Sequence, residues 1–436
     1  MTALSELLAG SWLDNWLMII PLMFICLFIN MPVWLAMFCG ILTYFLCYSN
    51  VPLMVAIQRL IATTQTPSLL AIPFFILLGT LMSYTGIAAR ILQIANVLIG
   101  RMRGGLGGAN ILVSTMMGGV SASNLADAAM LSRMMVPEME QKGYSRGFAA
   151  AITASGSLIT PIIPPGIALI LYGLVADVSI GSMFMAGILP GLLCSAMLIV
   201  TVWLVAIRRG LKPSSEHWPK PKEVSVALVQ AWPALFLIVA VIGGIRANIF
   251  TPTEAGAVAV LLVMFIGFVI YRELKFSHVF TALSETARST ASVMLIIMAS
   301  AALGWIFSLE RAGITVAEFV TSLTDNKYVF LLIINLLLLV LGMFLEGSAI
   351  LLILVPLLKP VVAHFGIDPV HFGIIMILNL SLGTLSPPVG TVMLLVCNTV
   401  QVSVGQFMRE AVPLLVSLIL LLLVITYIPA ISLLLV

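Results

Sequence analysis

Two short clusters of oxygen-bearing side chains interrupt apolar stretches, one in each half of the chain. The first is GGVSASNLADAAM at 118–130, and the second is MFLEGSAILL at 343–352. Glycine allows the chain to reverse direction at these points, and the side-chain and freed backbone oxygens are suitable ligands for a small hard cation. The alternative is that small residues only allow close helix packing, and for Ser121 alone this alternative is favoured.

Each cluster is followed by a pair of adjacent prolines within an apolar segment. ITPIIPPG at 159–166 recurs about 223 positions later as GTLSPPVG at 383–390. Proline lacks an N–H group and its ring collides with the preceding helical turn, so each pair is expected to break a helix and free backbone carbonyls. One copy alone is as readily explained by a structural kink, but matched broken helices in two halves indicate a transporter's binding site.

Two acidic residues lie within the apolar hairpins. An intramembrane carboxylate is costly and is a functional candidate by default. Glu346 is therefore interpreted either as a cation ligand or as a helix cap at the hairpin tip, with neither preferred. Asp127 follows the first tip by one turn, where the helix dipole is a sufficient explanation, and we give it a supporting role. No Lys or Arg is expected near the midplane, so an anion would be held by helix N-termini, hydroxyls and bound cations.

The composition requires a membrane protein. The chain has 436 residues, of which 61% are hydrophobic and 8% charged, and its mean hydropathy is +1.20. Soluble globular proteins carry about 25% charged residues. The net charge of +3 gives no sign of nucleic-acid binding, and five scattered cysteines without CxxC spacing indicate packing rather than a metal site or disulfides.

The elements that position these clusters recur in the same order in two halves. We expect an all-α polytopic membrane protein with a first repeat at 1–207, a cytoplasmic linker at 208–230 and a second repeat at 231–436. The first repeat is predicted to hold spans at 16–29, 32–49 and 66–84, a hairpin at 107–140, a broken span at 146–175 and a span at 182–207. The second is predicted to hold spans at 231–249, 252–271 and 291–308, a hairpin at 328–363, a broken span at 369–400 and a span at 407–434. Less apolar stretches at 51–65 and 275–288 have the composition of interfacial helices.

The distribution of basic residues predicts the orientation of the two halves. The 208–223 stretch is basic and proline-rich, and placing it inside leaves five of the 20 Lys and Arg residues outside: Arg59, Arg246, Arg311, Lys327 and Lys359. Both termini are then predicted to be periplasmic. The halves acquire opposite orientations, which is the inverted-repeat architecture of secondary transporters.

The motifs together resemble the large membrane subunit of tripartite ATP-independent periplasmic (TRAP) transporters. The resemblance rests on IPFFILLGTLMSYTGIAARI at 72–91, the hairpin at 118–130, SLITPIIPPGIALILYG at 157–173, FMAGILPGLL at 184–193, FTPTEAGAVA at 250–259 and GIDPVHFGIIMILNLSLGTLSPPVG at 366–390. It implies an elevator-type, sodium-driven importer of small organic anions in the bacterial inner membrane, surrounded by membrane lipids. It also implies a soluble periplasmic substrate-binding protein and a small four-helix membrane subunit, which we expect to be a separate chain.

The resemblance further implies two or more sodium sites and a substrate site between them. The expected sodium ligands of the first half are Ser121, Asn124, Ser155, Gly156 and Thr160, and those of the second are Glu346, Gly347, Ser348, Asn379, Ser381, Gly383 and Thr384. The expected substrate-binding residues are Ser121, Ser123, Asn124, Pro165, Gly166, Ser348 and Pro388. Departures from the usual motif, including Ser-Ala-Ser-Asn at 121–124, Glu346 in place of Asp and PPG at 164–166, leave the substrate class open among sialic acid, C4-dicarboxylates, sugar acids and sulfonates.

Two other classes of function remain to be weighed against transport. A channel also uses broken helices and inverted repeats, but paired reversals from opposite faces favour alternating access. For an intramembrane enzyme, the four histidines lie in loops or near span ends and no second acid matches Glu346. We therefore expect neither an enzyme nor an organic cofactor.

Overall fold

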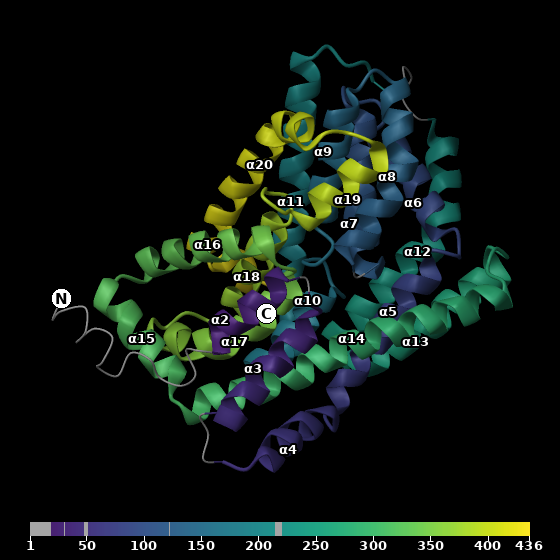
Figure 1. The fold of residues 1–436 in the computed structure, drawn as a ribbon. Coiled ribbons are helices and arrows are strands. Elements are labelled where there is room, and N and C mark those ends of the chain that lie inside the picture. The colour runs from purple at the N-terminus through teal and green to yellow at the C-terminus, as the bar shows by residue number, and fades with distance from the viewer. Residues whose placement is uncertain (1–18, 30, 48–50, 122, 214–219) are drawn as a thin grey trace.

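The computed structural model describes residues 19–436 except 30, 48–50, 122 and 214–219 (Figure 1). Within these residues the chain is helical, and it contains seven helices long and apolar enough to cross a membrane, or eight when one bent pair is counted as a span. The beginning of the first predicted span, the N-terminus and part of the 208–230 linker lie outside the described residues. The chain is thus an all-α polytopic membrane protein, as predicted.

The first half consists of short helices followed by one long span. Its elements, in chain order, are α2 (Ile19–Phe28), α3 (Val33–Cys47), α4 (Leu53–Thr64), the 3-10 turn η1 (Pro67–Leu70), α5 (Ala71–Met82), α6 (Ile87–Ile99), α7 (Gly105–Ser121), α8 (Asn124–Gln141), α9 (Arg146–Ser157), α10 (Ile167–Ala176) and α11 (Ile180–Arg208). The chain bends by 61° between α4 and the η1–α5 segment. The less apolar stretch at 51–65 therefore forms a separate helix.

The second half follows the same order with longer helices. Its elements are α12 (Pro221–Arg246), α13 (Pro252–Phe265), the π-helical turn η2 (Ile266–Ile270), α14 (Phe276–Leu309), α15 (Ala312–Leu323), α16 (Lys327–Phe344), α17 (Gly347–His364), α18 (Pro369–Gly383), α19 (Thr391–Val400), α20 (Val404–Tyr427) and the short α21 (Ala430–Leu433). Here the less apolar stretch at 275–288 is continuous with the following span in one 34-residue helix, α14.

Both hairpins reverse at a residue that caps the returning helix. The Ser123 hydroxyl accepts a hydrogen bond from the Ala126 backbone N–H at the start of α8. Glu346 accepts backbone N–H bonds from Ser348 and Ala349 at the start of α17. Capping satisfies N–H groups that a helix start leaves without partners, which matters most in an apolar environment. The tips therefore form where the clusters of small polar residues predict them.

Both proline pairs separate two half-helices. α9 ends at Ser157 and α10 begins at Ile167, whereas α18 ends at Gly383 and α19 begins at Thr391. The Pro164–Pro165 and Pro387–Pro388 peptide bonds are both cis. The second half-helix of each broken helix packs on the hairpin of the other half of the chain: α10 contacts α17, and α19 contacts α8. Through these contacts the two hairpins and the two broken helices form one body.

Three features differ from the sequence expectations. α12 begins at Pro221 rather than near 231, because Pro221 occupies the first helical turn and the Glu223 carboxylate accepts a hydrogen bond from the Lys220 N–H at 3.2 Å. The segment between α11 and α12 is therefore shorter than the linker predicted at 208–230. Two helices, α6 and α15, were not predicted and lie between the third span and the hairpin of each half. The last predicted span at 407–434 is divided near Pro429 into α20 and α21.

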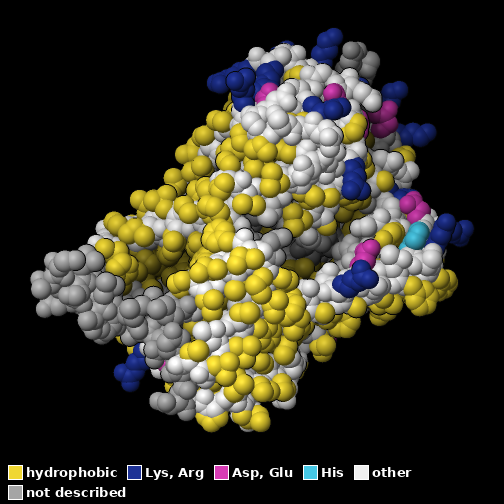
Figure 2. All heavy atoms as spheres, in the orientation of Figure 1, with side chains coloured by type: hydrophobic (Ala, Val, Ile, Leu, Met, Phe, Trp, Pro, Cys, Tyr) yellow, Lys and Arg dark blue, Asp and Glu magenta, His cyan; other side chains and the backbone are white. Residues whose placement is uncertain are grey.

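The surface has the charge distribution of a membrane protein. Hydrophobic side chains cover most of the visible face, and Lys and Arg side chains gather at its upper end (Figure 2). Large apolar side chains on the outer helices are exposed, including Trp232 on α12, Leu261 on α13 and Phe280 on α14. Lipid or a partner's helix can cover such a surface without the cost that water would impose.

Candidate substrate and cation site

The two hairpin tips meet at one cavity. Its volume is about 160 Å³, and residues from both tips and both broken helices line it. The lining residues are Ser123, Asn124, Leu125, Pro161, Ile167, Ala168, Val293, Glu346, Gly347, Ser348, Leu351, Ile377, Leu380, Ser381, Thr384 and Thr391. Seven of them belong to the sites expected from the sequence, so segments more than 200 residues apart in the chain converge as the repeat predicts. We call this space the tip cavity.

Four helix N-termini converge on the tip cavity. Asn124, Ile167, Gly347 and Thr391 all line it, and they are the first residues of α8, α10, α17 and α19. The N-terminal end of a helix carries roughly half a positive charge and presents free N–H groups, which makes it a site for anions. The lining residues include one carboxylate, that of Glu346, and no Lys, Arg or His. An anion in this cavity would depend on helix ends, hydroxyls and added cations.

Glu346 is bound into the second tip. Its Oε1 accepts hydrogen bonds from the Ser348 N–H at 3.1 Å and the Ser348 hydroxyl at 2.7 Å, and its Oε2 accepts one from the Ala349 N–H at 3.2 Å. The helix-cap interpretation is therefore confirmed. Capping leaves one further lone pair, on Oε2, because a carboxylate can accept about four hydrogen bonds. The negative charge also stays at the cavity, where it favours a cation.

The first tip has no carboxylate at the corresponding position. Ser123 caps α8 there, and the Asn124 Oδ1 accepts a hydrogen bond from the Leu125 N–H at 2.9 Å. Ser121 is the last residue of α7, and its side chain lies outside the described residues. The two tips thus share a fold but differ in charge.

A buried carboxylate lies one turn below the first tip. Asp127 is only 1% exposed, and its Oδ2 accepts a hydrogen bond from the Thr160 hydroxyl at 3.2 Å. The Ser114 hydroxyl on α7 approaches the same carboxylate. Asp127 Oδ1 and the hydroxyls of Ser114 and Ser155 have no hydrogen-bond partner among the described residues. A cradle of unpartnered buried oxygens around a carboxylate fits a small cation, because such groups are costly when left unsatisfied.

Gly156 completes this cradle. A Cβ atom at Gly156 would lie 3.1 Å from the Ser114 hydroxyl oxygen, so the absence of a side chain lets α7 and α9 approach closely. The structure therefore brings two of the expected first-half ligands, Gly156 and Thr160, together with Ser114 and Asp127. The buried Ser155 hydroxyl lies on the same helix as Gly156, one residue earlier in the chain. Asn124 lies apart from this cradle, at the tip cavity.

The second half contains a pair of buried amide groups on α16 and α18. Asn379 on α18 is fully buried, and its Nδ2 donates to the Asn335 backbone carbonyl at 2.9 Å and to the Asn335 Oδ1 at 2.7 Å. The Asn379 Oδ1 has no partner in the described part of the chain. Ser381 and Thr384 donate their hydroxyl protons to the Ile377 and Ser381 carbonyls. Their oxygens keep free lone pairs beside the tip cavity.

The carbonyl oxygens released by the second break are partly occupied. The Thr384 carbonyl accepts bonds from the Val392 and Met393 N–H groups, and the Gly383 carbonyl accepts one from Ser386. Gly383 itself packs against the backbone of Gly342 on α16, where an added Cβ would approach within 2.6 Å. Among the expected second-half ligands, Gly383 thus has a packing role that is evident from the structure.

A matched pair of buried hydrogen bonds ties each hairpin to its broken helix. The Asn110 Nδ2 on α7 donates to the Thr153 hydroxyl on α9 at 2.6 Å. In the second half Asn335 on α16 instead accepts from the Nδ2 of Asn379 on α18, so the donor and acceptor roles of the hairpin and the broken helix are reversed. Ser114, Asn110 and Asn335 were not predicted as site residues. The signal that could have found them is a polar residue at a comparable position in two otherwise apolar hairpin arms.

The paired prolines of the two breaks do not line the tip cavity, although Pro161 of the first break does. Pro165 is buried, and a Cβ at Gly166 would meet the Pro161 carbonyl at 2.4 Å. Pro388 is exposed. The three substrate-binding residues expected at the breaks, Pro165, Gly166 and Pro388, therefore lie behind the first residues of α10 and α19, which face the cavity instead.

Comparisons with known proteins agree with this architecture. Residues 20–431 match the family described as the DctM component of the tripartite ATP-independent periplasmic transporter. The YdaH transporter of Alcanivorax borkumensis, known from a crystal structure, has the same fold with a TM-score of 0.64 at 15% identity, covering 87% of this chain and 89% of that one.

Curated relatives extend over almost the whole chain. The sialic acid TRAP transporter large permease protein SiaM of Vibrio cholerae is 38% identical over 94% of this chain and 95% of its own length. The 2,3-diketo-L-gulonate TRAP transporter large permease protein YiaN of Escherichia coli is 35% identical over 92% of this chain and 94% of its own. The isethionate TRAP transporter permease protein DctMQ of Oleidesulfovibrio alaskensis is 33% identical over 93% of this chain but 64% of its own length. The chain therefore belongs to the DctM family, the large permease proteins of tripartite ATP-independent periplasmic transporters.

Proposed function

We propose that this protein imports a small organic anion across the bacterial inner membrane by coupling its movement to sodium ions. The observation that carries the proposal is the tip cavity, where two hairpin tips and four helix N-termini meet without a lining Lys or Arg. Helix N-termini favour an anion, but two or more cations bound nearby would supply the full positive charge that the lining lacks. Cation and anion binding would then depend on each other.

The chemical class of the substrate follows from what the named relatives share. SiaM, YiaN and the DctM protein of Pseudomonas aeruginosa are named for sialic acid, 2,3-diketo-L-gulonate and C4-dicarboxylates, which all carry a carboxylate. The DctMQ relative is named for isethionate, a sulfonate. An oxyanion is the common feature, and it suits the converging N–H groups. We therefore propose a small organic acid as the transported substrate.

We place the sodium ions on both sides of the tip cavity. In the first half, Asp127, Ser155 and Thr160 supply the oxygens. The Asp127 Oδ1 and the Ser155 hydroxyl are buried without a partner among the described residues, and the Thr160 hydroxyl donates to Asp127. In the second half, Glu346, Ser348 and Ser381 line the cavity directly. Sodium needs only neutral or singly charged oxygen ligands, so one carboxylate on each side with hydroxyls and carbonyls is a suitable set.

An elevator motion is the mechanism that the packing favours. Helices α7–α11 and α16–α20 form one body, because α10 packs on α17 and α19 packs on α8. The long helix α14 lies alongside this body, contacts α17 and contributes Val293 to the tip cavity (Figure 1). Movement of this body against α14 and its neighbours α3–α5 would carry the cavity as a unit. The alternative function, a channel, would require a continuous path across the membrane instead of a binding site that moves with the body.

A transporter of this family needs partners. We propose that a periplasmic substrate-binding protein delivers the anion and that a small membrane subunit covers part of the exposed apolar surface. The DctMQ relative extends beyond the region matched by this chain, which agrees with a second membrane component being fused there.

Uptake into proteoliposomes tests the proposed function. The large subunit is reconstituted with its small subunit and binding protein, and uptake of radiolabelled sialic acid, succinate, gluconate and isethionate is followed under an inward sodium gradient. We expect one of these acids to accumulate well above its external concentration with sodium, and to show little uptake with an equal potassium or proton gradient. Uptake that only equilibrates would favour a channel, and accumulation driven equally by potassium would refute sodium coupling.

A further inference from the structure

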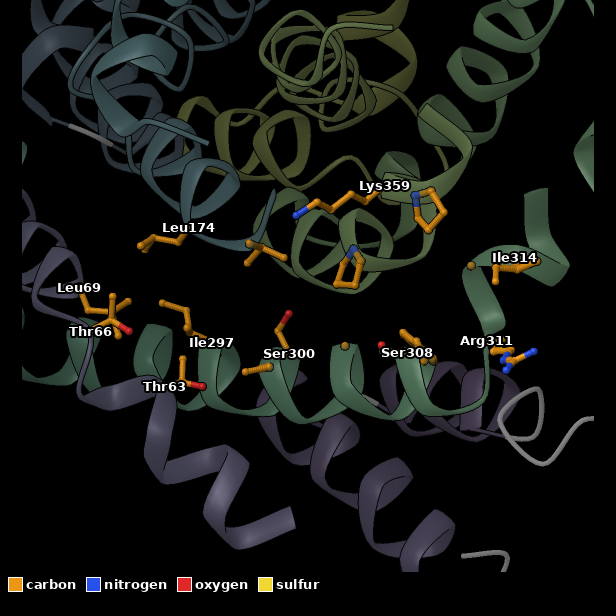
Figure 3. A pocket seen from close by; sticks show the side chains of 17 residues that line it. Thr63, Thr66, Leu69, Leu174, Ile297, Ser300, Ser308, Arg311, Ile314 and Lys359 are labelled. Atoms are coloured by element: carbon orange, nitrogen blue, oxygen red, sulfur yellow. The ribbon is translucent and has the colours of Figure 1, made fainter. Parts of the chain in front are cut away.

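A second and larger cavity lies away from the hairpin tips, between α14 and α17. Its volume is about 560 Å³, within the usual range of roughly 300–1,000 Å³ for small-molecule sites. α14, α15 and the segment joining α4 to η1 form one wall, and α10 and α17 form the other (Figure 3). We call it the α14–α17 cavity. It shares no lining residue with the tip cavity.

The walls of the α14–α17 cavity are largely apolar, with two cations at the edge. Leu69, Leu174, Ile297, Phe307 and Ile314 line it, together with the hydroxyl residues Thr63, Thr66, Ser300 and Ser308 and the cations Arg311 and Lys359. In Figure 3 the Lys359 side chain extends along the cavity, with its amino group on the side opposite Ser300. The lining contains no Asp or Glu, so its net charge is positive.

Neither cation is neutralised by the described part of the protein. No ion pair or side-chain hydrogen bond joins Arg311 or Lys359 to another described residue. An adjoining cavity of about 200 Å³ contains both Lys359 and Asp177, but these two also form no ion pair there. Two cations beside an apolar, acid-free space are electrostatically complementary to an anion that carries a hydrocarbon chain.

Arg311 is held in a costly backbone conformation. Its φ is +53°, in the left-handed region that favours glycine, and it precedes α15. The residue before α6 in the first half, Gly86, also has a positive φ of +71°. An L-residue adopts this conformation at a cost in free energy that glycine does not have.

We propose that the α14–α17 cavity binds one anionic amphiphile, with its acyl chain along α14 and its head group at the Lys359 amino group, while Arg311 at the far end of the cavity adds to its positive charge (Figure 3). A phospholipid phosphate and a fatty-acid carboxylate share this chemistry. A fully polar anion would leave the apolar walls uncovered, and a neutral lipid would leave both cations unpaired. Gly304 lines the cavity, and an added Cβ there would make only ordinary contact with Pro356 at 3.5 Å, so a side chain at this position would extend into the cavity without a backbone clash.

Lipid retention measured by native mass spectrometry tests this site. The purified complex of large and small subunits is delipidated, mixed with dioleoyl phosphatidylglycerol, washed and weighed. We expect one tightly held lipid per complex, and a reduction of its retention by at least tenfold in the R311Q/K359Q double variant. Gly304→Phe, which fills the cavity without changing charge, should reduce retention by a similar factor. Lys327→Gln removes an exposed cation outside the cavity and should leave retention unchanged.

Further ligands distinguish the source of the amphiphile. Sodium oleate that displaces the phosphatidylglycerol at comparable concentration would identify a free fatty acid as an equally good occupant, whereas failure of oleate to compete would identify the phospholipid. Equal retention of dioleoyl phosphatidylcholine would overturn the proposal, as would glycerol phosphate competing without an acyl chain. Unchanged retention in folded R311Q/K359Q protein, verified by its melting temperature, would also overturn it. The measurement uses neither sodium nor transported substrate. Its result therefore does not depend on whether the proposed transport function is correct.

Discussion

Replacing Gly383 with alanine is expected to abolish uptake and to lower the melting temperature of the purified protein. The new Cβ would lie 2.6 Å from the Gly342 Cα and carbonyl carbon, which are backbone atoms of α16 and cannot rotate away. α16 and α18 would have to separate, and the Asn335–Asn379 hydrogen bonds between them would lengthen. Overpacking of this kind costs about 1–3 kcal/mol. Thermal unfolding and uptake, measured on the same preparation, check both parts.

Two other glycines give this prediction a graded control. Gly342→Ala places its Cβ 3.1 Å from the Leu380 carbonyl oxygen, so a smaller loss is expected. Gly405→Ala, at the exposed start of α20, meets nothing within 4 Å and should be neutral or slightly stabilising. A Gly383→Ala protein that melts and transports like the wild type would show that the two helices are not tightly packed.

The second large effect is expected from Asp127. Asp127→Asn keeps the shape of the side chain but removes the charge from the buried cradle, where Thr160 donates to the carboxylate and the Ser114 hydroxyl has no partner among the described residues. We expect the sodium concentration for half-maximal uptake to rise at least tenfold, which corresponds to about 1.4 kcal/mol of binding free energy. The melting temperature should change little, since an amide can replace the carboxylate as acceptor for Thr160. Uptake as a function of sodium concentration provides the measurement.

A charge change elsewhere on α8 controls for general electrostatic effects. Glu140→Gln breaks an exposed ion pair with Arg146 at the other end of the helix, and exposed pairs contribute roughly 0–1 kcal/mol. It should leave sodium activation unchanged. If Asp127→Asn also leaves sodium activation unchanged, the buried carboxylate only serves to stabilise the helix start, and the first cation site lies elsewhere.

Much of the fold could be predicted because the sequence contains strong local signals. Adjacent prolines cannot continue a helix, so the break within each of these two spans could be predicted. The outer ends of the broken helices, at Arg146 and Ala176 and at Pro369 and Val400, agree with the predicted spans at 146–175 and 369–400 to within a residue. Clusters of small polar residues mark the tips equally well. α6 and α15 were missed because, at 13 and 12 residues, each is too short to be identified as a span by its hydropathy.

The candidate site could be predicted by region and only partly by residue. The tip residues Ser123, Asn124, Glu346 and Ser348 do meet in one cavity. The contacts of Asn110, Ser114 and Asn335 depend on which face of a buried helix each residue occupies, and an apolar hairpin arm gives little periodicity from which to infer that face. For the same reason the sequence favoured a dipole role for Asp127 and could not reveal the unpartnered oxygens around it.

The most direct test of sodium binding at the tip cavity is protection of a cysteine placed within it. Ala168→Cys, at a residue that lines the tip cavity and has no proposed ligand role, is introduced after the five native cysteines have been replaced. Its alkylation rate by a small maleimide is measured in the reconstituted complex. Sodium should slow alkylation several-fold, the transported acid should slow it further only when sodium is present, and potassium should have no effect. Ser322→Cys, on the exposed side of α15, should react at one rate throughout. Alkylation of Ala168→Cys that is unaffected by sodium, or that potassium slows equally, would contradict sodium binding at the tip cavity.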